Sequence, residues 1–202
     1  MRRRSVLLLL FIFVLVLIAL VSNFGPAERT LGVNVRSVYL HGAWVWTALV
    51  GIAAAALSGL VGLLTRRKQL QDWSIALGRT ALLFWITYLP LSLWAMSLNW
   101  NGLFLDEPRW RIAFDFAIIG ILVQLAIYLL KNSAYGSALN FLYGIAVAWS
   151  LSNADQVMHP DSPITSSNSD QIQLFFMSLT ALCLLAGVLL ASWLRIRAAE
   201  TS

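Results

Sequence analysis

Long uninterrupted apolar stretches are the feature that most limits the folds open to this chain of 202 residues. A helix of about 20 apolar residues can cross the hydrocarbon core of a bilayer. Six stretches approach this pattern, at residues 5–21, 38–64, 73–98, 112–130, 138–151 and 172–194. Of all residues, 59% are hydrophobic and only 11% are charged, whereas about a quarter are charged in soluble domains. We therefore predict an all-α polytopic membrane protein with six transmembrane helices.

Basic residues are concentrated at alternate connections of this predicted six-helix chain. The positive-inside rule places the side richer in Lys and Arg in the cytoplasm. Both termini are then cytoplasmic, and both histidines face the outer side. The net charge of +5 is explained by this distribution, so we expect no nucleic-acid binding. The basic residues assigned to the cytoplasmic side are Arg2, Arg3, Arg4, Arg66, Arg67, Lys68, Lys131, Arg195 and Arg197.

The chain is predicted to form a single transmembrane domain, residues 1–202. Its longest polar stretch, residues 152–171, is too short to build a separate core. The first stretch has no small-residue cleavage site after it, so we interpret it as a retained anchor helix at about residues 5–23. The links at residues 65–72 and 131–137 are short, so helices two and three, and four and five, should be antiparallel neighbours.

The first candidate site is the segment "SVYLHGAWVWTAL", residues 37–49, at the outer mouth of the second predicted helix. It places His41 three residues before Trp44, which puts both on one helix face. A histidine at this depth can simply hydrogen-bond to lipid headgroups or water. The other histidine, His159, lies in the polar segment "QVMHPDSPI", where a solvated side chain is the simplest interpretation.

The second candidate site is the outer loop "LNWNGLFLDEPRWR", residues 98–111. Its aromatic side chains can form an apolar platform, and its arginines can bind a carboxylate or propionate. The alternative is that acids and arginines neutralise each other near the interface. Arg111 and Asp115 have the i,i+4 spacing of a local ion pair on one helix face. The side chains considered are Trp100, Phe104, Trp110, Asp106, Glu107, Arg109 and Arg111.

Motifs of catalysis are missing from the sequence. It contains no GxxxxGK[ST] phosphate loop, no GxSxG, no HExxH and no Cys/His set with zinc spacing. The one cysteine, Cys183, lies inside the last apolar stretch, so no intramolecular disulfide can form. We therefore expect a binding or transfer protein and no enzyme.

Taken together, these segments resemble the haem-handling membrane proteins of cytochrome c maturation, specifically the six-helix CcmC type of the CcmC/CcmF/CcsA family. The resemblance covers about residues 36–197. In that family a "YLHVPxAW" segment supplies one external histidine, and a second external histidine precedes the last helix. His41 and His159 match these two positions, and Trp46 with Thr47 matches the end of the first motif. The resemblance implies that both histidines are axial ligands of haem iron.

The family's tryptophan-rich "WGxxWxWDxR" loop, the WWD motif, forms a platform for the porphyrin. Here "WNGLFLDEPRW" retains Trp100, Gly102, an acid and an arginine, with Phe104 near a family tryptophan position. Either Glu107 with Arg109, or Arg111 with Asp115, aligns with the family's acid and arginine. The resemblance implies haem contacts from Trp46, Trp100, Phe104 and Arg109.

By this resemblance, the chain holds b-type haem as a transported ligand at the outer face of the cell inner (cytoplasmic) membrane. It would deliver the haem to a CcmE-like chaperone, beside the subunits of an ABC-type membrane complex. Two alternatives remain. A small b-type electron-transfer cytochrome also uses paired histidines, but on helices within the bilayer. A permease subunit would bind no haem at all.

Overall fold

A computed structural model describes residues 2–158, 162–164 and 166–201 of the chain. Within these residues the chain forms six α-helices and no strand, which confirms the predicted all-α class. Each of the six apolar stretches lies inside one helix. The helices are α1 (Arg2–Ser22), α2 (Val35–Leu64), α3 (Lys68–Asn99), α4 (Pro108–Leu130), α5 (Ser133–Ser152) and α6 (Asp170–Thr201).

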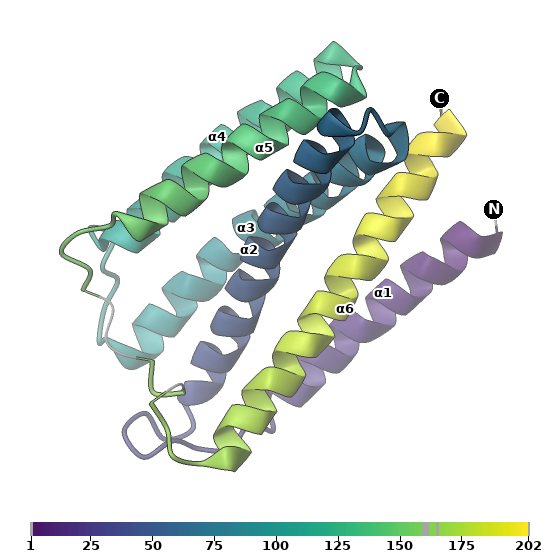
Figure 1. The fold of residues 1–202 in the computed structure, drawn as a ribbon. Coiled ribbons are helices and arrows are strands. Elements are labelled where there is room, and N and C mark those ends of the chain that lie inside the picture. The colour runs from purple at the N-terminus through teal and green to yellow at the C-terminus, as the bar shows by residue number, and fades with distance from the viewer. Residues whose placement is uncertain (1, 159–161, 165, 202) are drawn as a thin grey trace.

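The helices pack as a bundle with α2 and α3 in the middle (Figure 1). Helices α4 and α5 lie along one flank, and α1 and α6 lie along the other. The short turns between α2 and α3 and between α4 and α5 make these pairs antiparallel neighbours, as predicted. We call the end that holds both termini and these two turns the arginine end. The opposite end, which holds the connections 23–34 and 100–107 and the described residues of the connection between α5 and α6, is the loop end.

Polar side chains begin the helices on the α4–α5 flank. The Glu107 carboxylate accepts a hydrogen bond from the Trp110 amide at 2.6 Å, and Pro108 occupies the first helical position of α4. The Asn132 side chain accepts from the amides of Ala134 and Tyr135 and thereby begins α5. These side chains satisfy amides that have no partner within the helix. Glu107 and Asn132 therefore fix where the loop at residues 100–107 and the turn at residues 131–132 end and where α4 and α5 begin.

Five of the six helices, α1, α2, α3, α4 and α6, are long and apolar enough to cross a membrane. This indicates a membrane protein. Helix α5 is not among the five, although its 20 residues make it about 30 Å long. The reason is its polar content, since Ser137 and Asn140 lower its mean hydropathy while both are buried inside the bundle.

A buried hydrogen-bond network accounts for the polar residues of α5. The Asn140 amide donates to the Ser74 carbonyl at 2.9 Å, and its oxygen accepts from Gln124 at 2.9 Å. The Ser74 hydroxyl in turn donates to the Ala55 carbonyl at 2.8 Å. The network connects α2, α3, α4 and α5. Polar groups inside a membrane bundle are used in this way to join neighbouring helices.

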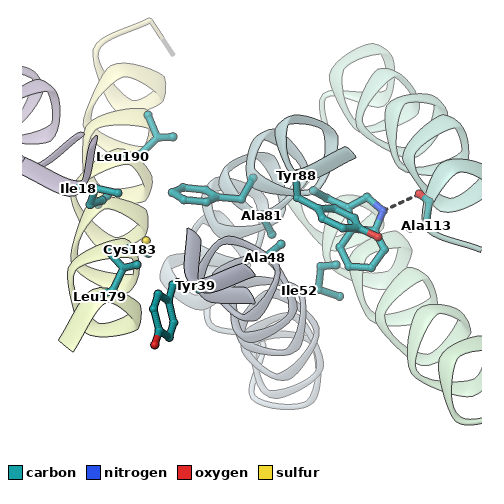
Figure 2. Close-up of a cluster of buried hydrophobic side chains, with 14 of the residues drawn as sticks. Ile18, Tyr39, Ala48, Ile52, Ala81, Tyr88, Ala113, Leu179, Cys183 and Leu190 are labelled. Atoms are coloured by element: carbon teal, nitrogen blue, oxygen red, sulfur yellow. Dashed lines mark hydrogen bonds between the residues drawn. The ribbon is translucent and has the colours of Figure 1, made fainter. Parts of the chain in front are cut away.

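The apolar core runs from α1 and α6 through α2 and α3 to α4 (Figure 2). Figure 2 shows Ile18, Cys183 and Leu190 on one side and Tyr88 with Ala113 on the other. Trp85, only 1% exposed, donates its indole N–H to the Ala113 carbonyl at 2.9 Å. This bond satisfies the one polar atom of the indole and fixes α3 against α4.

Close helix packing depends on Gly59, where α2 meets α5. A Cβ atom at this position would lie 2.8 Å from the Ser137 carbonyl oxygen and 2.8 Å from the Ser74 hydroxyl. The carbonyl belongs to the backbone, so it cannot move without shifting α5. By contrast, a Cβ at Gly187 would lie 3.4 Å from the nearest atom, the Thr47 methyl group, which is an ordinary contact.

Gly59→Ala is therefore expected to lower the free energy of unfolding by about 1–3 kcal/mol, the usual effect of overpacking. Gly187→Ala is the matched control, and its better helix propensity, worth up to about 1 kcal/mol, makes it neutral or slightly stabilising. Thermal unfolding of the purified proteins in detergent measures both. Equal midpoints for the two variants would contradict the close approach of α2 and α5.

Candidate functional site

A cavity of about 190 Å³ opens at the loop end between α2 and α3. Two connections complete its wall, one before α2 and one before α6. Most of the lining is apolar, with one imidazole and a few hydroxyl and amide groups. The lining residues are Thr30, Leu31, Val38, His41, Ser92, Ala95, Met96, Asn99, Trp100 and Pro163.

His41 lines this cavity from the second turn of α2. It is half-buried, and its ring lies 5.4 Å from that of Tyr88 on α3 at an angle of 41°. The predicted partner Trp44 instead packs between the helices. Its indole donates to the Thr87 hydroxyl at 2.9 Å and its ring lies 4.6 Å from Phe84. The aromatic wall beside the imidazole is therefore Tyr88.

Trp100 also lines the cavity, directly after the end of α3. Its amide donates to the Met96 carbonyl at 2.8 Å, which fixes the residue directly after the helix. Its ring meets Phe104 edge-on, with centroids 5.7 Å apart. Phe104 itself is exposed at 42% and is not among the described residues that line the cavity. It contacts the Trp100 ring without lining the cavity itself.

His159 lies outside the residues that the structure describes. Four residues further along, Pro163 lines the cavity, and the next side chain, Ile164, is 3% exposed within the apolar core. Ile164 therefore anchors this connection beside the cavity.

Trp46 and Arg109 are not brought to the cavity. Trp46 lies five residues after His41, about 140° around the helix, and is 54% exposed on the outer surface of α2. Arg109 is exposed in the first turn of α4. The expected pair of Arg111 with Asp115 is wrong, because Arg111 contacts Asp106 at 3.7 Å. Asp106 precedes the helix, and Arg111 turns back toward it.

The connection before α2 is held in shape by Glu28. Its carboxylate accepts hydrogen bonds from the Thr30 hydroxyl and amide and from the Leu31 amide. The Thr30 hydroxyl and then the Leu31 amide lower the pKa of the Glu28 carboxyl below its ordinary value. The carboxylate is therefore charged at neutral pH, and its stabilising effect is lost only as the pH falls through this lowered pKa. Thr30 and Leu31 are thus fixed as part of the cavity wall.

Sequence reasoning missed the contribution of α3 to the cavity. Ser92, Met96 and Asn99 recur at helical spacing and share one face of α3. The prediction that this stretch is a membrane-crossing helix gives no reason to single out that face. Asn99 donates to the Ser37 hydroxyl at 3.0 Å and so ties α3 to α2 directly beside the cavity. Met96 adds a polarisable thioether to the wall.

Comparison with known proteins adds nothing to this geometry. No family model, curated protein or solved structure matches the chain.

The donor set of the cavity restricts the ligands that it suits. Among the described residues, no group of three or more His, Cys, Asp or Glu side chains could hold a metal ion. An iron already held by its own macrocycle needs only one or two axial ligands from the protein. An imidazole on a rigid helix, surrounded by apolar and aromatic side chains, fits such a ligand better than it fits a bare ion.

Proposed function

We propose that the chain binds b-type haem at the outer face of the membrane and delivers it to a partner during cytochrome c maturation. His41 and His159 are the axial ligands in this proposal, and Trp100 contacts the porphyrin. The observation that carries the proposal is the cavity at the loop end. It joins His41, Trp100 and the segment that follows His159, three features far apart in sequence.

The size of the cavity supports delivery rather than permanent storage. Pockets that enclose a small-molecule ligand usually measure roughly 300–1,000 Å³. At about 190 Å³, this cavity can take one edge of a porphyrin and leaves the remainder outside the bundle. An electron-transfer cytochrome would bury the whole ring between its helices. A partly exposed ring remains accessible to a chaperone.

The two ligands differ in what holds them. His41 belongs to a membrane helix, whose backbone hydrogen bonds cannot be exchanged for water. His159 lies in a sequence rich in Pro, Ser, Asn and Asp, which is typical of irregular loops. In this proposal His41 is the firm ligand and His159 is the ligand that is released. One firm ligand and one releasable ligand suit a protein that gives its haem to a CcmE-like chaperone, beside an ABC-type complex.

The proposed topology has six spans, with both termini on the cytoplasmic side of the cell inner membrane. Arg4 on α1 and Glu200 on α6 form an ion pair at 3.1 Å, so the start of the first helix lies beside the end of the last. A chain that begins and ends on one side crosses an even number of times, so we propose that α5 crosses as well. Its length of about 30 Å matches the hydrocarbon core.

Cysteine labelling tests this topology. Leu103→Cys and Asn168→Cys, both exposed at the loop end, are expected to react with a membrane-impermeant reagent from outside. Lys131→Cys, exposed at the arginine end, should react only after the membrane is opened. The native Cys183 is fully buried and should give little background. Labelling of the loop-end cysteines only in opened membranes would contradict the outward-facing cavity.

Haem binding by the purified protein tests the proposed function itself. Trp100→Ala removes an aromatic wall of the cavity and is expected to weaken haem retention by about tenfold. The loss combines an aromatic stacking contact, worth roughly 1 kcal/mol, with the apolar area that the indole would bury against the porphyrin. Trp94→Ala is the matched control, because Trp94 is 45% exposed near the same end of α3 and is not among the lining residues.

The two tryptophan variants separate the proposal from its alternatives. Equal retention in both would place the haem elsewhere on the protein. Absence of haem from the wild-type protein, reconstituted with excess haem, would favour a permease subunit. The amount of membrane-inserted protein, measured for each variant, shows whether loss of haem reflects loss of fold.

A further inference from the structure

A second, much smaller cavity lies inside the bundle, where α2, α3, α4 and α5 meet. It shares no lining residue with the cavity at the loop end. Its volume of about 10 Å³ is room for about one water molecule. Apolar side chains and glycines form most of the wall, and polar side chains reach it from α4 and α5. The lining residues are Ile52, Ala55, Gly78, Leu82, Gly120, Gln124, Asn140 and Tyr143.

The hydrogen bonds around this cavity fix which end of the Gln124 amide is left over. The Ser74 carbonyl can only accept a hydrogen bond, so the Asn140 atom that meets it at 2.9 Å is the amide nitrogen. The Asn140 oxygen is therefore the atom that faces Gln124, which donates to it from its own amide nitrogen at 2.9 Å. Gln124 Oε1 is consequently left without a hydrogen-bond partner among the described residues, although it is buried.

The Tyr143 hydroxyl supplies a second acceptor at the same cavity. It donates its one proton to the Phe116 carbonyl at 2.8 Å, so the lone pairs of its oxygen remain available. Both Gln124 and Tyr143 line the cavity, and each presents an oxygen that can accept. Buried acceptors are rarely left unpaired in native proteins, and a polar cavity with two or more such partners holds water, whereas an apolar cavity stays dry.

We infer that this cavity is a binding site for one water molecule, which donates its two protons to Gln124 Oε1 and to the Tyr143 hydroxyl oxygen. Water is neutral, carries two donors and matches the cavity in size. A hard cation such as Ca²⁺ would need about six to eight oxygen ligands, far more than these two. The bound water would extend the network of Ser74, Asn140 and Gln124 to Tyr143 and so connect α4 to α5 at a further point. The inference does not depend on the proposed function.

Solid-state NMR of the full-length protein in lipid bilayers tests this site by measuring the transfer of magnetisation from water to individual N–H groups. The side-chain amide of Gln124 is expected to receive magnetisation at short transfer times. The Trp85 indole N–H is the dry reference inside the same bundle, because Trp85 is 1% exposed and donates to the Ala113 carbonyl at 2.9 Å. Equally slow transfer to both groups would overturn the site. So would transfer to Gln124 only at times long enough for the Tyr143 hydroxyl proton to exchange.

Gly120→Ala is the variant that fills the cavity. The added Cβ would lie 2.6 Å from Leu82 Cδ1 and 2.8 Å from the Tyr143 hydroxyl oxygen, so the methyl group takes the place of the water. Transfer from water to the Gln124 amide should then be lost. Gly144→Ala is the matched control, because its Cβ would make an equally close contact, 2.7 Å from the Ala56 Cβ, but Gly144 is not among the lining residues. Transfer should persist in this variant.

The two glycine variants separate a bound water from a general effect of packing. Loss of transfer in Gly120→Ala alone supports the site. Persistent transfer in a folded Gly120→Ala protein, or equal loss in both variants, would contradict it. Thermal unfolding of each variant shows whether it is folded. If Gly120→Ala does not fold, the comparison of Gln124 with Trp85 in the wild-type protein still decides the question.

Discussion

Replacing His41 with alanine is expected to abolish haem binding. The imidazole is the one nitrogen ligand that the described residues bring into the cavity, and it is held by the backbone of α2. Losing even a supporting residue of a metal site often weakens affinity by about 10- to 100-fold. Losing the firm ligand itself should exceed that range. The measurement is haem retained per chain after purification, with cytochrome c maturation in cells as the second readout.

Trp46→Ala is the matched control for the His41 substitution. It removes a larger side chain from the same helix, five residues away, but from the face turned away from the cavity. Haem retention should stay close to that of wild type. The family resemblance makes the opposite prediction, since it assigns Trp46 to the haem contact. Loss of haem in the Trp46 variant would mean that the porphyrin lies along the outer surface of α2 and outside the cavity.

Replacing His159 with alanine is expected to have a different effect, because ordering the loop on the iron costs about 1–2 kcal/mol per residue fixed. The net contribution of this ligand is therefore smaller than that of His41. Some haem should remain bound, with a five-coordinate or weakly six-coordinate absorption spectrum. Maturation of cytochrome c should nevertheless stop. A variant with unchanged maturation would show that His159 takes no part in delivery.

The fold could be predicted in outline from apolar length alone. Each of the six stretches became a helix, because a chain in hydrocarbon must satisfy its backbone hydrogen bonds internally. Helix α5 marks the limit of this reasoning. Asn140 makes the stretch look weak as a span, yet it is bonded to Ser74 and Gln124 inside the bundle. The hydropathy value of a polar side chain is the same whether or not the side chain has a hydrogen-bond partner.

The site could be predicted only in part, because the sequence does not show which faces of neighbouring helices meet. His41 and Trp100 were predicted, and the cavity brings them together. Met96 was missed because its role depends on which face of α3 meets α2. The family resemblance assigned Trp46 to the haem contact, whereas the helix turns it about 140° away from His41. Arg111 contacts Asp106 and not Asp115, because a side chain in the first turn of a helix can reach the loop that precedes the helix.

The most direct test of the central claim is the absorption spectrum of the purified protein after reconstitution with haem, recorded for wild type and for the two histidine variants. The proposal predicts stoichiometric haem with a six-coordinate low-spin spectrum in wild type. It predicts no bound haem in His41→Ala, and residual haem with an altered spectrum in His159→Ala. An unchanged low-spin spectrum in both variants would mean that neither histidine is a ligand, and the haem proposal would have to be abandoned.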